Sequence, residues 1–205
     1  MIELVYPVDS KVPVLPNATV ATAGVAAAGA SRKRKTSNDE MFPVIQEDGL
    51  VVAMAGRAYC HSGSHLLHPV VHLHIIDRKE RLLLQKRSLK KDLQPGKWDT
   101  SVGGHVRYGE SVMEALYREA REEVGLTEFN PIYLGSYRYD TEKDSEYVVM
   151  FAAVGSFDLH PDRDEVDECR PWTLREIEKG IREDVFTLNF VSEYKQIKSK
   201  LLSLL

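Results

Sequence analysis

Residues 104–126 read GHVRYGESVMEALYREAREEVGL, and this stretch contains a helix with clear ends. Ser111 is a suitable N-terminal cap, and Glu114 three residues later completes a capping box. Gly125 stands where a left-handed residue would end the helix. Between these ends, apolar residues recur every four positions, at Val112, Leu116, Ala120 and Val124. The pattern predicts a helix over 111–124 with one face packed on a sheet.

The same helix carries a cluster of carboxylates that folding alone does not explain. Glu122 and Glu123 stand three and four residues after Glu119, so both side chains lie near it. Like charges at this spacing destabilise a helix, and the macrodipole disfavours anions near its C-terminus. One interpretation is a solvated acidic face, in which Arg118 pairs with Glu122. The other is a site for a hard cation, since clustered carboxylate oxygens suit Mg²⁺ or Mn²⁺.

Length and composition limit the classes of protein to be considered. The chain has 205 residues, 43% of them hydrophobic, which suffices for one globular domain with a sizeable core. The formal net charge of -4 argues against a strongly basic nucleic-acid-binding protein. The chain lacks the roughly 18 consecutive apolar residues that a membrane span needs. Two cysteines, Cys60 and Cys169, are too few for a disulfide framework. We therefore expect a cytoplasmic protein without a nucleic-acid or membrane partner.

The first forty residues differ from the rest of the chain. They are rich in Ala, Gly, Val, Thr and Pro, and a basic quartet follows at 32–35. A secretory signal would place its positive charges ahead of the apolar segment instead. Because the Ala/Gly segment lacks large side chains to bury, we expect a flexible arm over 1–40. The domain itself is expected to span 41–205.

Hydrophobic patterning within the domain predicts strands on both sides of the glutamate-rich helix. We expect strands at 42–45, 50–54, 69–76, 82–85, 98–102, 133–139 and 146–154. Two further helices are expected near 174–182 and 191–204. Strands before, between and after helices favour a mixed α/β or α+β sandwich.

Nine positions in residues 104–126 resemble the complete Nudix box. They are Gly104, Glu110, Arg118, Glu119, Ala120, Glu122, Glu123, Gly125 and Leu126. The resemblance implies a Nudix fold, in which a mixed β-sheet is sandwiched between α-helices. It also implies an Mg²⁺-dependent enzyme, with Mn²⁺ as the alternative cofactor, that directs water onto a diphosphate phosphorus.

The resemblance also implies roles for individual residues. The metal ligands would be Glu119, Glu122, Glu123 and, through its carbonyl, Gly104. Arg118 would orient the glutamates, and Glu110 would support the loop before the helix. The general base is left unassigned, because Nudix enzymes differ in the carboxylate they use.

Residues 42–190 are similar, more narrowly, to the isopentenyl-diphosphate isomerase branch of the Nudix superfamily. That branch binds a divalent metal through residues that match His61, His68, His105, Asp144 and Glu146. Its diphosphate-binding cations match Arg87 and Lys91, and a guanidinium with an ammonium suits a diphosphate. The resemblance implies a second metal site, where imidazoles would favour Mn²⁺, Zn²⁺ or Fe²⁺ over Mg²⁺. The alternative is that these residues form structural hydrogen bonds.

Two other histidines are interpreted without a ligand. His72 and His74 alternate within the predicted strand 69–76, so their side chains share one face. We interpret them as residues of the polar side of that strand. Phe186, Phe190 and Tyr194, near the last predicted helix, are interpreted as core residues.

The chain departs from the isomerase pattern at its proton-transfer residue. Gly103 stands where those enzymes have a cysteine, and the stretch 184–186 offers no matching tryptophan. The Nudix box, which isomerases have in degraded form, is intact here. We therefore predict a hydrolase that cleaves a small-molecule diphosphate, such as a nucleoside diphosphate linked to another moiety. An isomerase with a different acid and a non-catalytic diphosphate-binding module stay open as alternatives. A homodimer also stays open, since no motif decides the oligomeric state.

Overall fold

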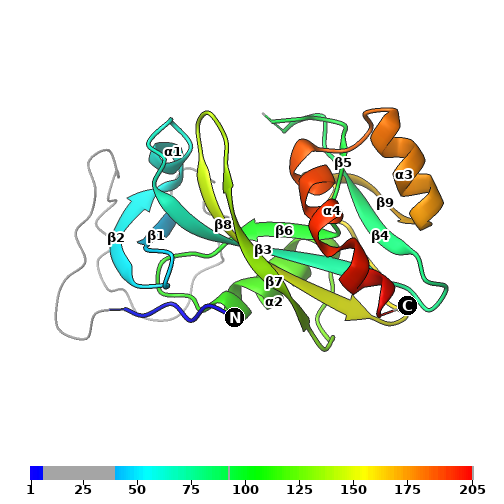
Figure 1. Ribbon diagram of the computed structural model, residues 1–205, viewed down its shortest axis with the longest axis horizontal. Helices are drawn as coiled ribbons and strands as arrows, with labels where there is room; N and C mark the ends of the chain where they lie inside the picture. The colour runs from blue at the N-terminus through cyan, green and yellow to red at the C-terminus, as the bar shows by residue number, and fades with distance from the viewer. Residues whose placement is uncertain (7–39, 92, 205) are drawn as a thin grey trace, which may run out of the picture.

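A mixed seven-stranded sheet forms the centre of the molecule (Figure 1). The computed structural model describes residues 1–6, 40–91 and 93–204. Strand β3 (Leu67–Ile76) pairs in parallel with β8 (Ser145–Val154) and antiparallel with β6 (Val102–His105). The remaining strands are β4 (Leu82–Arg87), β5 (Trp98–Asp99), β7 (Ile132–Asp140) and β9 (Val166–Trp172). The sheet order is β5-β4-β3-β8-β7, with β6 on β3 and β9 on β4.

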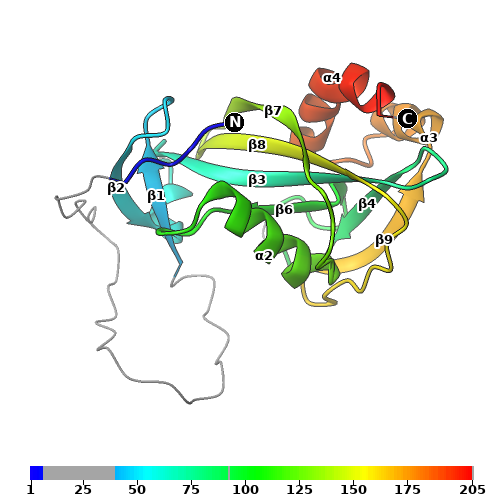
Figure 2. The same ribbon diagram turned by 90° about the horizontal axis from the view of Figure 1, so that it is seen from below.

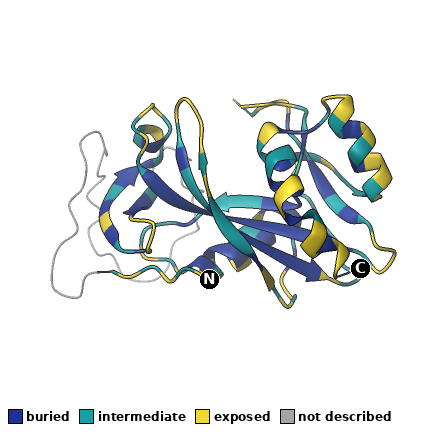
Figure 3. Cartoon of the chain, in the orientation of Figure 1, coloured by how far each residue is buried: buried dark blue, intermediate teal, exposed yellow. Residues whose placement is uncertain are grey.

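Helices cover both faces of this sheet, as Figure 2 shows. Helix α2 (Val112–Val124) lies on one face, and α3 (Leu174–Arg182) and α4 (Leu188–Leu202) lie on the other. All ten residues of β3 are buried (Figure 3). Val70 and Ile76 belong to one hydrophobic cluster, and Val71, Leu73 and Ile75 belong to another. The predicted sandwich of a mixed sheet between helices is confirmed. In the described part of the chain, no helix is long and apolar enough to cross a membrane.

The ends of helix α2 are those that the sequence predicts. Ser111 accepts a hydrogen bond from the Glu114 backbone N–H, while the Glu114 carboxylate accepts one from Ser111, so the capping box is complete. Gly125 ends the helix in the left-handed region, with φ of 71°. This capping fixes the start and end of the segment that carries the candidate metal ligands.

A small N-terminal hairpin packs beside the central sheet. It consists of β1 (Met41–Ile45), β2 (Val51–Gly56) and the short helix α1 (Arg57–Cys60), which surround a cluster containing Phe42. Residues 1–6 lie against this hairpin, since the backbone of Val5 pairs with Leu50. The rest of the expected flexible arm, residues 7–39, lies outside the described residues.

Several segments differ from the sequence-based expectation, among them the short helix α1, which the sequence analysis does not predict. The single strand predicted at 98–102 is divided into β5 and β6, because the chain crosses there from β4 to β3. At the crossing, Thr100 donates a hydrogen bond to the Leu73 carbonyl at 3.2 Å, and Ser101 accepts one from the Ile75 N–H at 2.8 Å. Strand β9 was not predicted, because its charged residues and Pro171 hide the alternation that marks a strand.

Leu116 provides a test of the packing between α2 and the sheet. This side chain is fully buried, so Leu116→Ala is expected to lower the free energy of unfolding by about 2–5 kcal/mol. Urea unfolding would measure the loss. The matched control is Leu188→Ala, because Leu188 is 67% exposed and its truncation leaves no cavity. Equal losses in the two variants would contradict this packing.

Candidate active site

Arg118 organises the glutamate-rich helix from a nearly buried position. Its guanidinium donates to both carboxylate oxygens of Glu110, at 2.7 and 2.8 Å, and to the His105 carbonyl at 2.8 Å. The same group forms ion pairs with Glu119 and, at 3.4 Å, with Glu122. These partners raise the pKa of Arg118, so it stays charged. Arg118 therefore ties the loop before α2 to two of the predicted metal ligands.

Glu119 lies directly over Gly104. A Cβ atom at Gly104 would come within 2.1 Å of the Glu119 carboxyl carbon, so no other residue fits there without displacing this carboxylate. Burial raises the pKa of Glu119 to about 7, against the opposing charge of Arg118. Glu122 lies at the rim of the site, where 45% of its side chain is exposed. Its carboxylate is 3.5 Å from Arg107, a second cation at this edge.

Glu123 is the most enclosed of the three carboxylates. One of its oxygens accepts hydrogen bonds from the Gly103 N–H and the Gln85 side chain, both at 3.2 Å. Burial, followed by the charges of Glu119 and Glu165, raises the pKa of Glu123 to about 8. Burial disfavours the charged form of both carboxyl groups, and the nearby cations offset this only in part, so both pKa values lie above the usual range. A divalent cation would favour the ionised form of both groups.

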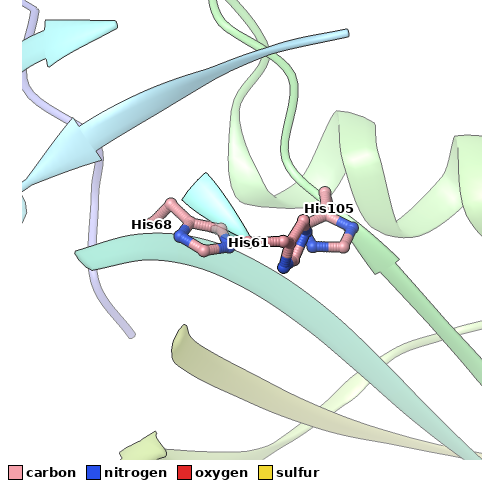
Figure 4. A group of neighbouring side chains, drawn as sticks. All are labelled: His61, His68 and His105. Atoms are coloured by element: carbon pink, nitrogen blue, oxygen red, sulfur yellow. The ribbon is translucent and has the colours of Figure 1, made fainter. Parts of the chain in front are cut away.

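The five residues of the predicted second site also lie close together. One nitrogen from each of the His61, His68 and His105 rings lies within 4.8 Å of the others, and His68, Asp144 and Glu146 form a second such group. Figure 4 shows the three imidazole rings lying next to one another. They come from the end of α1, from β3 and from β6. The structure therefore gathers residues that are distant in the sequence.

Several polar atoms of this cluster are buried without a hydrogen-bond partner. They are the Nε2 atoms of His61, His68 and His105 and the Oδ1 atom of Asp144. The other nitrogens are engaged, since His61 Nδ1 pairs with Asp144 and His68 Nδ1 lies 2.8 Å from the Leu66 carbonyl. Buried polar groups normally have partners, and each exception requires an explanation. This set of imidazole nitrogens and a carboxylate oxygen would suit a bound metal, which would account for the missing hydrogen-bond partners.

Burial favours the neutral form of the ligands in this cluster, which suits metal binding by the imidazoles but opposes it at the carboxyl group of Glu146. It lowers the pKa of His68 and of His105, which favours neutral imidazoles. Burial and the charge of Asp144 raise the pKa of Glu146 to about 7. Phe42 stacks on the His105 ring, with centroids 4.4 Å apart and planes within 2°, and so fixes the orientation of that ring.

One contact would have to change for His105 to bind a metal through Nε2. Arg57 Nη1 lies 3.2 Å from His105 Nδ1, which makes Nδ1 the acceptor and places the ring proton on Nε2. Metal binding would move that proton to Nδ1 and end this hydrogen bond. The same Arg57 nitrogen is 3.2 Å from Glu40, so Arg57 would keep this partner after its hydrogen bond to His105 is lost.

Each of the two predicted diphosphate-binding cations is paired with an acid. Arg87 contacts Asp99 at 3.2 Å, and Lys91 contacts Glu165 at 2.7 Å. Lys91 is close enough to Glu123 for its charge to lower the pKa of that carboxyl. A bound diphosphate would exchange these carboxylates for phosphate oxygens.

A further buried network was not anticipated from the sequence. Glu193 in α4 accepts from His72 at 2.7 Å, from His74 at 2.5 Å and from the Tyr137 hydroxyl at 3.0 Å. The interpretation of His72 and His74 as polar-side residues is therefore wrong, because both are buried under α4. The sequence does contain a signal for this network. Glu193 falls between Phe190 and Tyr194 on the buried face of α4, and a buried glutamate needs a partner.

Comparisons with known proteins agree with this geometry. The NUDIX domain family matches residues 66–189, which is more than half of the chain. The chain belongs to the Nudix family. The match begins after His61, so the N-terminal hairpin lies outside the Nudix segment that the family defines.

Curated relatives of this Nudix protein carry two kinds of name. An isopentenyl-diphosphate Delta-isomerase of Mycolicibacterium vanbaalenii is 32% identical over 147 residues, covering 67% of this chain and 81% of that protein. A Yersinia pestis protein named as an uncharacterized Nudix hydrolase is 31% identical over 150 residues, covering 72% and 80%. A crystal structure from Deinococcus radiodurans superposes with a TM-score of 0.67 at 20% identity, covering 77% of this chain and 99% of that one. The last comparison supports the Nudix fold.

The raised pKa values predict that stability depends on pH and Mg²⁺ together. Without metal, Glu119 and Glu123 favour folding while protonated, so this contribution is present below about pH 4.5. It is lost as the pH rises through about 7 to 8. Mg²⁺ binds the ionised carboxylates, so its stabilising effect is expected to grow from pH 5 to pH 8. At a roughly hundredfold excess over its Kd, it should raise Tm by about 5–10 °C at pH 8.

Thermal unfolding at several pH values, with and without Mg²⁺, measures this difference. In Glu123→Gln the Mg²⁺-dependent rise in Tm should be smaller at pH 8. An increase in Tm that is the same at pH 5 and pH 8 would show that the cation binds elsewhere.

Proposed function

We propose that this Nudix protein is an Mg²⁺-dependent hydrolase that cleaves a diphosphate linkage. Its substrate would be a nucleoside diphosphate linked to another moiety, or a related diphosphate. The observation that carries the proposal is the arrangement of the intact box, in which Arg118 holds Glu119 over Gly104 and Glu123 is buried against the Gly103 N–H. The Nudix resemblance implies that a hydrolase needs the glutamates of the box, and the chain retains each of them.

The carboxylates have the chemistry expected of magnesium ligands. Mg²⁺ prefers oxygen ligands, and Glu119, Glu122 and Glu123 supply carboxylate oxygens along one side of α2. The close approach of Glu119 to Gly104 brings a backbone carbonyl into the same region. When bound, Mg²⁺ would neutralise phosphate oxygens and lower the pKa of the attacking water.

The protein's own residues would orient the reacting groups. Arg118 holds Glu119 and Glu122 through its ion pairs, so these carboxylates do not have to reorganise when the substrate arrives. Gln85 and the Gly103 N–H fix one oxygen of Glu123. Arg87 and Lys91 would bind the substrate's phosphate oxygens, because a guanidinium and an ammonium complement a diphosphate.

A second metal in the histidine cluster forms part of the same proposal. The unpartnered Nε2 atoms and the adjacent carboxylates Asp144 and Glu146 support a centre for Mn²⁺, Zn²⁺ or Fe²⁺. Such a centre would place additional positive charge beside the substrate. Its ligands come from the end of α1, from β3, from β6 and from the start of β8, whereas the three glutamates of the Nudix box come from α2.

Isomerase activity is the second candidate function, and the same histidine cluster favours it. Relatives named isopentenyl-diphosphate Delta-isomerase support this alternative. Gly103 argues against it, because this position lacks the thiol that the isomerase resemblance requires. Cys60 does not replace that thiol, since it is fully buried in the hairpin cluster and burial raises its pKa to about 12.

Glu123→Gln tests the hydrolase proposal. The variant keeps the shape of the side chain but removes a ligand charge, so turnover is expected to fall by about 100-fold or more. Phosphorus NMR in Mg²⁺ buffer would follow a pool of nucleotide sugars, dinucleotides, nucleoside triphosphates and isopentenyl diphosphate. New phosphomonoester signals from the wild type would identify a hydrolase, and the consumed signal would identify its substrate class.

The matched control is Glu128→Gln, because Glu128 is an exposed glutamate just beyond the helix. It should retain wild-type turnover. Full activity in Glu123→Gln would remove the hydrolase proposal. An unchanged phosphorus spectrum with altered allylic protons would favour the isomerase.

Elemental analysis tests the histidine centre. Protein purified without chelators is expected to carry about one transition-metal ion per chain. His68→Gln should weaken that binding by at least about 10-fold, since a ligand is lost from a buried set. The matched control is His65→Gln, because His65 is exposed and lies three residues away. Metal-free wild-type protein after metal-supplemented growth would count against this centre.

A further inference from the structure

Glu193 joins helix α4 to strand β3 through two imidazoles. One carboxylate oxygen lies 2.7 Å from His72 Nδ1, and the other lies 2.5 Å from His74 Nε2. The Tyr137 hydroxyl donates to the first oxygen at 3.0 Å. Hydrogen bonds from both rings keep the pKa of the buried Glu193 carboxyl far below its usual range, although burial alone would raise it. Glu193 is therefore a fixed negative charge under the sheet.

The two histidines differ in what their second nitrogen meets. His74 is completely buried, and its Nδ1 faces the Thr100 hydroxyl at 3.4 Å. His72 keeps 10% of its side chain exposed, and its Nε2 has no hydrogen-bond partner among the described residues. That nitrogen faces the position of Gly103, where an added Cβ would lie only 3.4 Å from it. Because Gly103 has no side chain, residue 103 does not fill the space in front of His72 Nε2.

This space lies between the groups that the proposed function uses. The Gly103 N–H is bound to Glu123, and His105 follows two residues later on β6. Asp99, the partner of Arg87, and Glu146 of the histidine cluster are close enough to His72 for their charges to raise its pKa. His72 thus lies among residues that flank both Arg87 and the histidine cluster.

His72 is also equipped to donate a hydrogen bond. Burial lowers the pKa of His72, but the charge and hydrogen bond of Glu193 outweigh it and raise the pKa to about 9. With Nδ1 committed to Glu193, Nε2–H is directed at the space over Gly103. An anionic oxygen is the acceptor that a charged imidazole binds best.

We propose that His72 is a substrate-binding residue that donates its Nε2–H to an oxygen of the bound diphosphate, with Glu193 as its positioning residue. This inference rests on the proposed binding of a diphosphate, but it does not require the diphosphate to be hydrolysed. It gives a role in the site to a histidine and a helix outside the Nudix box.

The test uses the full chain and a diphosphate that is not hydrolysed, the Mg²⁺ complex of methylenediphosphonate. Calorimetry would compare the wild type with His72→Gln, whose amide can still donate to Glu193. Loss of a hydrogen bond to an anion is expected to weaken Kd by about 10-fold or more. The matched control is His74→Gln, which alters the same buried network but faces no open space. Its Kd should stay within about twofold of wild type.

The outcomes separate this inference from the hydrolase proposal. Equal affinity of His72→Gln and wild type, an equal loss in His74→Gln, or a wild type that does not bind the probe would overturn the role of His72. The hydrolase proposal fails separately, if the wild type binds the probe but turns over no diphosphate. Should His72→Gln not fold, crystals of the wild type with the probe decide. A phosphonate oxygen at hydrogen-bonding distance from His72 Nε2 supports the proposal, and a bound probe without that contact contradicts it.

Discussion

The pairing of β3 with its two neighbours is the constraint on which both candidate sites depend. β3 is hydrogen-bonded to β8 along its whole length and to β6 over four residues. This pairing places His68 opposite Glu146 and His72 opposite Gly103. A slip of one residue would move every one of these side chains to the other face of the sheet. The difference between the two faces of β3 fixes the register, because a slip would move His72 and His74 away from Glu193 and into the apolar cluster under α2.

The carboxyl groups clustered on α2 destabilise the fold, and neighbouring residues offset this effect only in part. Glu119 and Glu123 are like charges at neighbouring positions of a helix, and both are buried. Arg118 reduces the repulsion with a single guanidinium that also serves Glu110. A fully neutralised cluster would be more stable, but it would leave no charge for a cation. The clustered carboxyl groups therefore make the metal-free protein less stable, and they form a site whose negative charge a cation can neutralise.

Local signals in the sequence predict the main helices and strands. They do not predict which distant residues come into contact. Helix α2 follows from its cap, its glycine and its four-residue spacing, and the positions of its glutamates follow with it. Strand β9 escapes prediction because charges interrupt its alternation. The contact of Glu193 with His72 joins residues 121 positions apart. A glutamate on an apolar helix face signals a buried partner, but it does not reveal which strand supplies that partner.

The hairpin ahead of the central sheet makes the two candidate centres separable. The Nudix family matches residues from 66 onward, and the glutamate site lies wholly within that part of the chain. The histidine centre draws His61, together with the stacked ring of Phe42, from the segment before it. An exchange of this segment between relatives would replace a ligand and the packing of the histidine centre. The glutamates of α2 would keep their own positions and lose only contacts at the rim, such as that of Glu40 with Arg107. One candidate centre can therefore vary through a segment that supplies no ligand to the other.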